Sequence, residues 1–184
     1  MNENIVIVYH SGYGHTAKIA EAVAEGSTGQ LIAIDAEGNI TDEAWNLLQK
    51  AKTIVFGSPT YMGNVSWQFK KFADASSKVW FEQGWKDKIG AAFTNSASVA
   101  GDKQTTLYTL FTLAQQHGMV WVGTGMMPSN AKSAHRDDVN YLSSFAGLAT
   151  ASPSDASPDE IPSGDLITAR LFGKRLADMT NRIA

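Results

Sequence analysis

The sequence predicts an α/β protein in which five parallel strands form one doubly wound sheet between two layers of helices, a three-layer sandwich. Two observations support this fold class. Short runs rich in β-branched residues alternate along the chain with longer stretches of helical periodicity. Strands that alternate with helices pair in parallel through right-handed crossovers. Because 184 residues suit one domain and no repeat interrupts the pattern, we predict a single domain over residues 1–184.

The first half of the chain supplies three strands and two helices. Three short runs rich in β-branched residues predict the strands: residues 4–9, 31–34 and 53–56. The first run is continuously apolar, as in a strand that is buried on both faces. Residues 16–26 have helical spacing and end at Gly26, a candidate C-cap. Thr41 is a candidate N-cap for a helix over residues 42–50.

The second half completes the alternation. The remaining elements follow in order: a helix over 65–76, a strand over 89–93, a helix over 104–117, a strand over 119–122 and a closing helix over 164–182. Two connections, 77–88 and 123–162, exceed the usual few residues, and loops this long are usually functional or poorly ordered. The second contains a stretch rich in serine and proline, 151–158, for which a plain solvated excursion is an equal alternative.

Composition excludes several classes of chemistry. The chain has no cysteine, which excludes disulfides, thiol nucleophiles, iron–sulfur clusters and cysteine–zinc sites. Its formal net charge of −3 is too mild to predict binding to nucleic acid or to a membrane surface. No apolar run approaches the roughly 18 residues of a membrane span, and the start of the chain has no basic region typical of a signal peptide. We therefore expect a cytoplasmic protein whose redox chemistry, if any, depends on a bound cofactor.

The loop after the first strand, residues 10–16, is a candidate phosphate site. In an open parallel sheet, ligands bind beyond the carboxyl ends of the strands. Glycines in this loop let backbone N–H groups turn inward, and the helix that follows adds partial positive charge. The loop contains no lysine or arginine, so neutral donors and oriented dipoles would hold the anion. A tight turn capped by Ser11 is the alternative interpretation.

Two other phosphate-binding motifs compete with this interpretation. A P-loop needs a lysine before its serine or threonine, and His15 stands there instead. Residues 12–17 fit the pattern G-x-G-x-x-A of dinucleotide-binding folds, and Asp35 ends the second strand where a ribose-binding acid is expected. The alternative for Asp35 is a turn with Glu37 and Gly38. A chain of this length leaves no second domain to hold a substrate, which argues against a dinucleotide.

Two further loops suit a planar ring. The loop over residues 57–64 follows the third strand, and its proline and glycines fix a path that lets Tyr61 and Met62 lie beside a ring. The loop over residues 94–101 follows the fourth strand and is small and polar, which allows the backbone to approach a heterocycle closely. Together the three loops predict one binding segment for a phosphate and two for a ring.

Several segments resemble the flavodoxin-like NAD(P)H:quinone oxidoreductases, and most closely the branch called tryptophan-repressor-binding protein. These segments are residues 11–16, residues 57–64 with Gln68, and residues 113–120. The resemblance covers nearly the whole chain and implies a flavodoxin-like fold, FMN as the cofactor, and NADH or NADPH as the electron donor. Trp80 also falls where that branch carries a tryptophan over the flavin.

The resemblance implies a role for each loop, with the phosphate on the first loop and the ring between the other two. The cofactor-binding residues that it implies are Ser11, Gly12, Tyr13, Gly14, His15, Thr16, Pro59, Thr60, Tyr61, Met62, Gly63, Thr94, Asn95, Ser96, Ala97, Ser98 and Gly101. Tyr13 and Trp80 would line a position shared by the nicotinamide and the quinone. No catalytic or metal-ligating side chain is predicted, because the flavin carries the chemistry.

The predicted function is an FMN-dependent NAD(P)H oxidoreductase that reduces quinones or related acceptors by two electrons, as a homodimer or homotetramer without nucleic-acid partners. Tyr61 departs from the branch, which usually has arginine there, so the acceptor stays open. The alternative is a flavodoxin-type carrier that passes single electrons to protein partners. Such carriers are typically strongly acidic, and a net charge of −3 argues modestly against one. A third possibility is a scaffold that binds no flavin.

Overall fold

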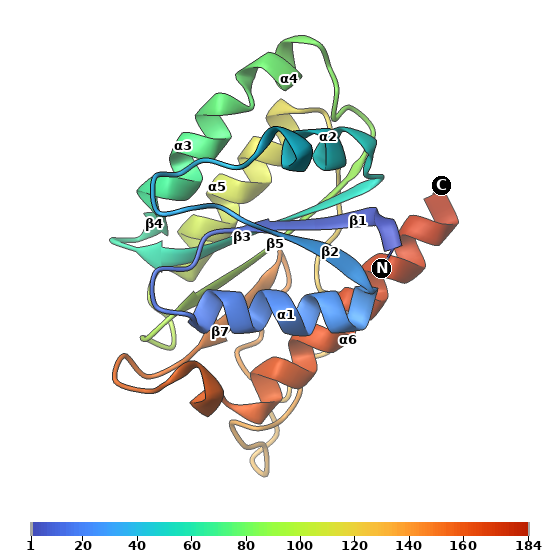
Figure 1. The fold of residues 1–184 in the computed structure, drawn as a ribbon. Coiled ribbons are helices and arrows are strands. Elements are labelled where there is room, and N and C mark those ends of the chain that lie inside the picture. Colours follow the sequence, from blue (N-terminus) through green and yellow to red (C-terminus); the bar gives the residue numbers. More distant parts are fainter. Residues whose placement is uncertain (1, 184) are drawn as a thin grey trace.

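The computed structural model describes residues 2–183, and its centre is a sheet with the strand order β2-β1-β3-β5-β6 (Figure 1). These strands are β1 (Asn2–Tyr9), β2 (Gly29–Ala33), β3 (Thr53–Tyr61), β5 (Ile89–Ser96) and β6 (Val120–Trp121). Each neighbouring pair along this order is parallel. The sheet continues to both sides of β1, so the predicted doubly wound arrangement is confirmed.

Helices cover both faces of the sheet, as predicted for a three-layer sandwich (Figure 1). Two helices lie on one face: α1 (His15–Ser27) and α6 (Ser163–Ile183). Four lie on the other: α2 (Asp42–Lys50), α3 (Trp67–Ala75), α4 (Ser77–Phe81) and α5 (Lys103–Gln116). Successive residues of a strand point to opposite faces. Accordingly, Val6 and Val8 belong to the core under α2, α3 and α5, whereas Ile5 and Ile7 belong to the core under α1 and α6.

Side-chain caps begin two of these helices, one at Thr41 as predicted and one at Ser66, for which no cap was predicted. The Thr41 hydroxyl accepts a hydrogen bond from the N–H of Ala44 at 3.2 Å and starts α2. The Ser66 hydroxyl accepts from the N–H of Phe69 at 3.3 Å and starts α3. Because an N-cap satisfies a backbone donor that the helix itself leaves unpaired, each of these residues decides where its helix begins.

The prediction that Gly26 ends the first helix is wrong. Gly26 lies inside α1, which ends at Ser27 and is followed by the C-cap residue Thr28 in the left-handed region with φ of 57°. A Cβ atom on Gly26 would overlap the backbone carbonyl of Arg170, and one on Gly173 would overlap that of Val23. The two glycines therefore let the backbones of α1 and α6 cross in direct contact, a role that depends on a distant segment and not on the local sequence.

Two strands run further at their carboxyl ends than predicted. The third strand, β3, continues to Tyr61, and a two-residue turn at Met62 and Gly63 leads into β4 (Asn64–Val65). Both turn residues have positive φ, 48° and 76°, as in the turns that match the twist of a hairpin. The predicted loop over residues 57–64 is thus a strand end and a hairpin. Likewise, β5 extends to Ser96. Both extensions consist mainly of small or polar residues, so they lie outside the apolar runs that predict strands.

The last strand of the sheet is divided into two pieces. The short strand β6 pairs with the beginning of β5, whereas β7 (Leu148–Ala151) pairs with its end. Residues 122–147 form an insertion that leaves the sheet after β6 and returns at β7. The prediction of one loop over residues 123–162 is wrong, because this segment contains β7 and the 3₁₀ helix η1 (Pro158–Glu160). The predicted loop over residues 77–88 likewise contains α4.

The edge of the sheet at β6 carries an aromatic group. The rings of Tyr108 and Phe111 lie 6.0 Å apart, and those of Phe111 and Trp121 lie 5.4 Å apart. The indole N–H of Trp121 donates to the carbonyl of Ala146 at 2.6 Å, which attaches the end of the insertion to this edge.

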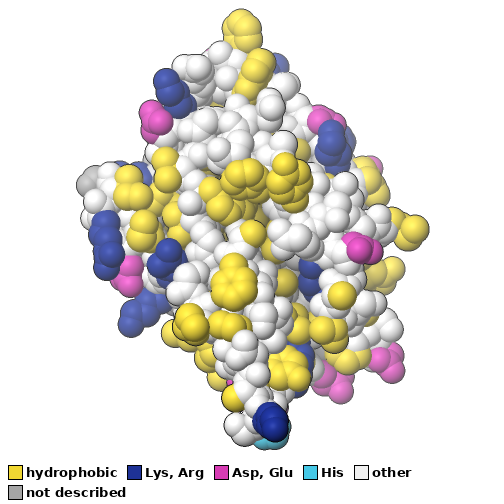
Figure 2. Space-filling model, turned by 180° about the vertical axis from the view of Figure 1, so that it is seen from behind, with side chains coloured by type: hydrophobic (Ala, Val, Ile, Leu, Met, Phe, Trp, Pro, Cys, Tyr) yellow, Lys and Arg dark blue, Asp and Glu magenta, His cyan; other side chains and the backbone are white. Residues whose placement is uncertain are grey.

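Hydrophobic side chains also gather near the middle of the surface seen from behind (Figure 2). Within residues 2–183, no helix is long and apolar enough to cross a membrane.

Candidate functional site

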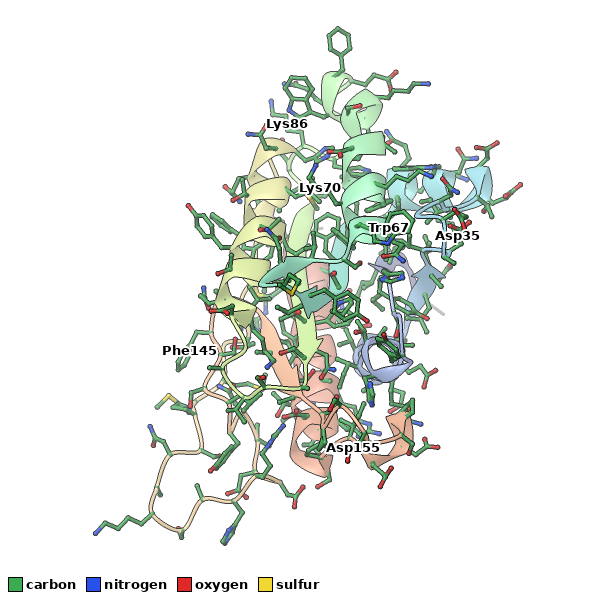
Figure 3. The ribbon with its side chains drawn as sticks, turned by 90° about the vertical axis from the view of Figure 1, so that its left-hand side faces the viewer. Asp35, Trp67, Lys70, Lys86, Phe145 and Asp155 are labelled. Atoms are coloured by element: carbon green, nitrogen blue, oxygen red, sulfur yellow. The ribbon has the colours of Figure 1, made fainter. Side chains whose placement is uncertain are left out.

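A cavity of about 650 Å³ lies at the carboxyl edge of the sheet, where the sequence predicts a site. Four segments form it: the loop after β1, the hairpin after β3, the loop between β5 and α5, and the segment after β7. The lining residues are Tyr13, His15, Thr16, Pro59, Thr60, Tyr61, Met62, Gly63, Asn95, Ser96, Ala97, Ser98, Gly101, Asp102, Ser152 and Ser154. No lysine or arginine is among them. Figure 3 faces this edge, with Trp67 of α3 above and Asp155 after β7 below.

The loop after β1 presents unpaired backbone donors. The Ser11 hydroxyl oxygen accepts from the N–H groups of Gly14 and Ala17, both at 3.1 Å. Ser11 therefore organises the loop from behind, and it does not line the cavity. In the part of the chain that the structure describes, the N–H groups of Tyr13, His15 and Thr16 donate to no protein acceptor. Three free donors at the start of a 13-residue helix suit an anion.

The segment after β7 packs against this first loop. Gly14 has φ of 90°, and a Cβ atom there would lie 2.6 Å from Pro158. The His15 ring donates from Nε2 to the carbonyl of Ala156 at 2.9 Å. The Lys18 ammonium forms an ion pair of 2.9 Å with Asp159. Residues far apart in the sequence thus enclose the end of the cavity at α1.

The hairpin after β3 places an aromatic pair at the cavity. The rings of Tyr13 and Tyr61 meet edge to face, with centroids 6.3 Å apart. Burial and the neighbouring Tyr13 both raise the pKa of Tyr61, so its phenol is neutral over the physiological range. Tyr13 is 78% exposed and Met62 is fully exposed. The mouth of the cavity is therefore apolar and open to solvent on this side.

A network of buried hydroxyl and amide groups forms the floor. The Thr60 hydroxyl donates to that of Thr106 at 2.8 Å and accepts from that of Thr94 at 2.8 Å. Asn95 donates from Nδ2 to Ser152 at 2.9 Å and accepts at Oδ1 from Thr150 at 2.8 Å. Because buried polar groups that are fully paired resist rearrangement, this network holds the ends of β3, β5 and β7 in one arrangement.

The structure adds three lining residues that the sequence did not predict. Ser152 and Ser154 lie in the segment for which the sequence left a functional loop and a plain solvated excursion as equal alternatives, and only the pairing of β7 with β5 brings them to the cavity. Asp102 precedes α5 with φ of 54°, and its exposed side chain makes no cap hydrogen bond. An acid between a glycine and a helical run was a recognisable signal for Asp102. No local signal marks the two serines.

Four predicted residues are not among those that line the cavity. Ser11, Gly12 and Gly14 shape the first loop, and Thr94 is fully buried in the floor. The prediction that Trp80 lines the same position as Tyr13 is not met within one chain. Trp80 lies in α4, beside His117 and Gly118 at the amino ends of the strands. The cause is the direction of α3, which begins at the carboxyl edge and carries the chain to the opposite one.

Asp35 has the turn role that the sequence left open. Its Oδ1 atom accepts from the N–H groups of Glu37 at 2.9 Å and Asn39 at 2.8 Å. These hydrogen bonds lower the pKa of Asp35. Because the carboxylate already serves the turn after β2, the match to a dinucleotide-binding motif loses its ribose-binding acid.

A family model described as NADPH-dependent FMN reductase matches residues 14–133. The chain belongs to this family. This family member is 54% identical to flavodoxin FldP of Pseudomonas aeruginosa over 94% of each chain. It is 33% identical to an NAD(P)H dehydrogenase (quinone) of Solidesulfovibrio magneticus over 98% of each. The crystal structure of a WrbA-like flavodoxin from Agrobacterium tumefaciens covers all of both chains, with a TM-score of 0.81 and 48% identity.

These similarities confirm the flavodoxin-like fold of this family member. They do not single out the tryptophan-repressor-binding branch, because the relatives carry the names of both flavodoxins and quinone dehydrogenases. The comparisons therefore support membership of the family and leave the branch within it open.

Proposed function

We propose that this chain binds FMN in the cavity at the carboxyl edge and acts as a flavodoxin-type electron carrier. The observation that carries the proposal is the pairing of an anion-binding helix start with an open, apolar mouth that has no basic side chain. The relative that is named a flavodoxin is also the more similar of the two proteins compared, at 54% against 33% identity. This proposal reverses the order of the two functions that the sequence predicts.

The residues of the first loop fit the phosphate of FMN. A Cβ atom on Gly12 would lie 2.5 Å from the Tyr61 hydroxyl, so only glycine leaves the loop this close to the hairpin. The N–H groups of Tyr13, His15 and Thr16 would donate to the phosphate oxygens, and the hydroxyl hydrogen of Thr16 would add a further donor. A site built from neutral donors at a helix start holds an anion without a lysine or arginine.

The other two segments would hold the ring. Tyr61 offers the face of a neutral aromatic ring, and the backbone of residues 95–101 offers a polar edge. When bound, FMN supplies the redox chemistry, whereas the protein orients it and sets its surroundings. The buried network of Thr60, Thr94 and Asn95 would keep the two ring-binding segments at a constant separation.

The surface around the mouth favours a protein partner over a nicotinamide donor. Tyr13, Met62 and Val99 are exposed apolar side chains on the segments that form the site. Exposed apolar side chains of this kind mark surfaces that contact other proteins. A nicotinamide dinucleotide carries a diphosphate, and none of the residues that line the cavity offers a lysine or arginine to pair with it.

An NAD(P)H oxidoreductase that reduces quinones is the second candidate. The description of the family model and the 33% identical quinone dehydrogenase favour it. The edge-to-face pair of Tyr13 and Tyr61 is the structural observation on its side, because an exposed aromatic ring beside the cavity suits a flat nicotinamide or quinone.

Anaerobic spectroscopy of the FMN-loaded protein distinguishes the two candidates. We expect NADH and NADPH to leave the flavin absorbance unchanged over minutes, and a chemical reductant to reduce the flavin in two resolved one-electron steps. A protein without added donor and free FMN with donor are the controls. Rapid bleaching by either nucleotide in a single two-electron step would overturn the carrier and support the oxidoreductase. A protein that takes up no FMN would overturn both.

A further inference from the structure

Lys103 is a buried lysine next to the cavity, and it has no role in the site as described so far. It is the first residue of α5, and only 3% of its surface is exposed. Its ammonium group donates to the backbone carbonyl of Ser98 and, at 3.2 Å, to that of Val99. Both carbonyls belong to the loop over residues 96–101, which contributes Ser96, Ala97, Ser98 and Gly101 to the cavity lining.

Lys103 donates to these two carbonyls and not to the carboxylate of Asp165. Asp165 of α6 and Arg136 of the insertion are the charged side chains that act on it. The Asp165 carboxylate is occupied, because it accepts from both Nη atoms of Arg136, at 2.6 and 2.5 Å, and from the N–H of Ala151 at 2.8 Å. Burial lowers the pKa of Lys103 to about 8, with Asp165 opposing and Arg136 adding to this effect. The ammonium form therefore predominates at pH 7.

The position of the ammonium group determines which way the loop faces. In a trans peptide the N–H points away from the C=O. Since Lys103 holds the carbonyls of Ser98 and Val99 on its own side, the N–H groups of Val99 and Ala100 point to the other side, and they donate to no acceptor within residues 2–183. Gly101 has φ of 51°, and a Cβ atom there would lie 2.9 Å from the Ser98 carbonyl, so the loop closes tightly over Lys103.

We propose that Lys103 is a positioning residue for the bound ring: its ammonium group holds residues 96–101 with their free N–H groups turned outward, available to the carbonyl-rich edge of the flavin. This inference rests on the proposed binding of FMN. Lys103 acts through the loop and does not itself touch the ligand. Loss of its charge would release the carbonyls and let the loop turn its donors elsewhere.

Lys88 provides a matched control within the same chain. Its ammonium group also donates to backbone carbonyls, those of Leu48 at 3.1 Å and Ala51 at 2.7 Å, where it closes the end of α2. This lysine immediately precedes β5 and lies at the amino ends of the strands, away from the cavity. A substitution of Lys88 removes the same kind of ammonium–carbonyl hydrogen bond but leaves the proposed ring-binding loop, residues 96–101, as it is.

The test compares the dissociation constants of FMN and riboflavin for wild type, Lys103→Met, Lys103→Arg and Lys88→Met, measured by quenching of flavin fluorescence. We expect Lys103→Met to weaken both ligands by the same factor, about tenfold, because each loses the oriented donors but neither loses a phosphate contact. Lys103→Arg keeps the charge and should recover most of the affinity. Lys88→Met should bind both flavins as wild type does, with a lower unfolding midpoint in urea.

A pH series gives a readout that a purely structural role would not change. The affinity of wild type for riboflavin should fall between pH 7 and pH 9, as Lys103 loses its proton, and that of Lys103→Met should stay level. Equal affinities for wild type and Lys103→Met, or an equal loss in Lys88→Met, would overturn the role of Lys103 while leaving FMN binding intact. Wild-type protein that binds neither flavin would instead overturn the proposed function.

Discussion

His117 is held in the core as a neutral base. The Ser76 hydroxyl donates to the carbonyl of Ala73 at 2.7 Å, so the hydrogen bond of 2.9 Å between Ser76 and His117 runs from Nε2–H of the ring to the hydroxyl oxygen. The Nδ1 atom then has no proton, and in the described chain it has no partner either. The ring packs on Trp85 with centroids 4.3 Å apart. Burial lowers the pKa of His117 to about 4.

This arrangement predicts a loss of stability in mild acid. Because the folded state takes up the proton near pH 4 and the unfolded state near its ordinary value of 6.5, stability falls as the pH drops through this window and levels off below it. The loss due to His117 should be about 3 kcal/mol. His117→Gln keeps a donor for Ser76 but has no charge to gain. We therefore expect urea unfolding at pH 7.5 and pH 4.5 to differ less in this variant than in wild type.

Burial also lowers the pKa of His10, whose Nδ1 atom is unpartnered in the described chain as well. Protonation of His10 therefore also lowers the free energy of unfolding in acid. The His117→Gln variant should still lose some stability in acid, but less than wild type. A pH dependence equal to that of wild type would show that His117 is not the source.

At the scale of elements, the segment over residues 152–160, here called the strap, joins the sheet to α1. A capping box stabilises η1 within it: the N–H of Ser157 donates to the Glu160 carboxylate at 2.8 Å. The contact of Lys18 with Asp159 and that of His15 with Ala156 attach the strap to the first turns of α1. The strap therefore lies against the loop where the phosphate of FMN is proposed to bind.

Asp159→Asn should speed the release of FMN by removing the ion pair with Lys18. Since exposed ion pairs contribute little, the dissociation rate should rise only about threefold at low salt, and the difference should vanish in high salt because screening removes it. Displacement of FMN into excess apoprotein, followed by fluorescence, measures this rate. Asp74→Asn is the matched control, because it removes the exposed pair with Lys70 on α3, away from the strap. An equal rate for both variants would contradict this role of the strap.

At the scale of the whole molecule, the site depends on segments that lie between residues 13 and 154. Arg136 and Asp165 extend this dependence to the insertion and to α6. The guanidinium group of Arg136 donates to the Ala151 carbonyl at 2.9 Å, and Asp165 accepts from the Ala151 N–H, so both backbone polar groups of Ala151 at the end of β7 are held. A ligand in the cavity therefore contacts elements that unfolding would separate.

FMN should accordingly stabilise the entire fold. A ligand that binds only the native state at a concentration 100 times its dissociation constant raises the free energy of unfolding by about 2.7 kcal/mol. We expect the thermal midpoint to rise with FMN and to rise less with riboflavin at the same concentration, because riboflavin has no phosphate for the first loop. Adenosine monophosphate, which has a phosphate but a different ring, is the control. Equal shifts with all three ligands would contradict specific binding. The homodimer or homotetramer stays a prediction, which analytical ultracentrifugation measures.

The parts of this site that the sequence predicted have local signals. Glycines next to a helix start marked the first loop, and the positions of Tyr61 and Asn95 followed from counting strand ends. Ser152 could not be found in this way, because β7 is only four residues long and its pairing partner lies more than 50 residues earlier. The role of Lys103 was hidden for a similar reason. A lysine at the start of a helix suggests a solvated side chain until the tertiary structure shows it buried.

The sequence by itself determined the alternation of strands and helices, the cap of α2, and the position of the glycine-containing loop before α1. Each of these properties depends on residues within a turn or two of one another, so short-range sterics and hydrogen bonding suffice to set them. Only the tertiary structure decided that β7 completes the sheet, that Gly26 serves a helix crossing, and that Trp80 lies away from the cavity. These outcomes depend on contacts between segments distant in the sequence, which local propensities do not encode.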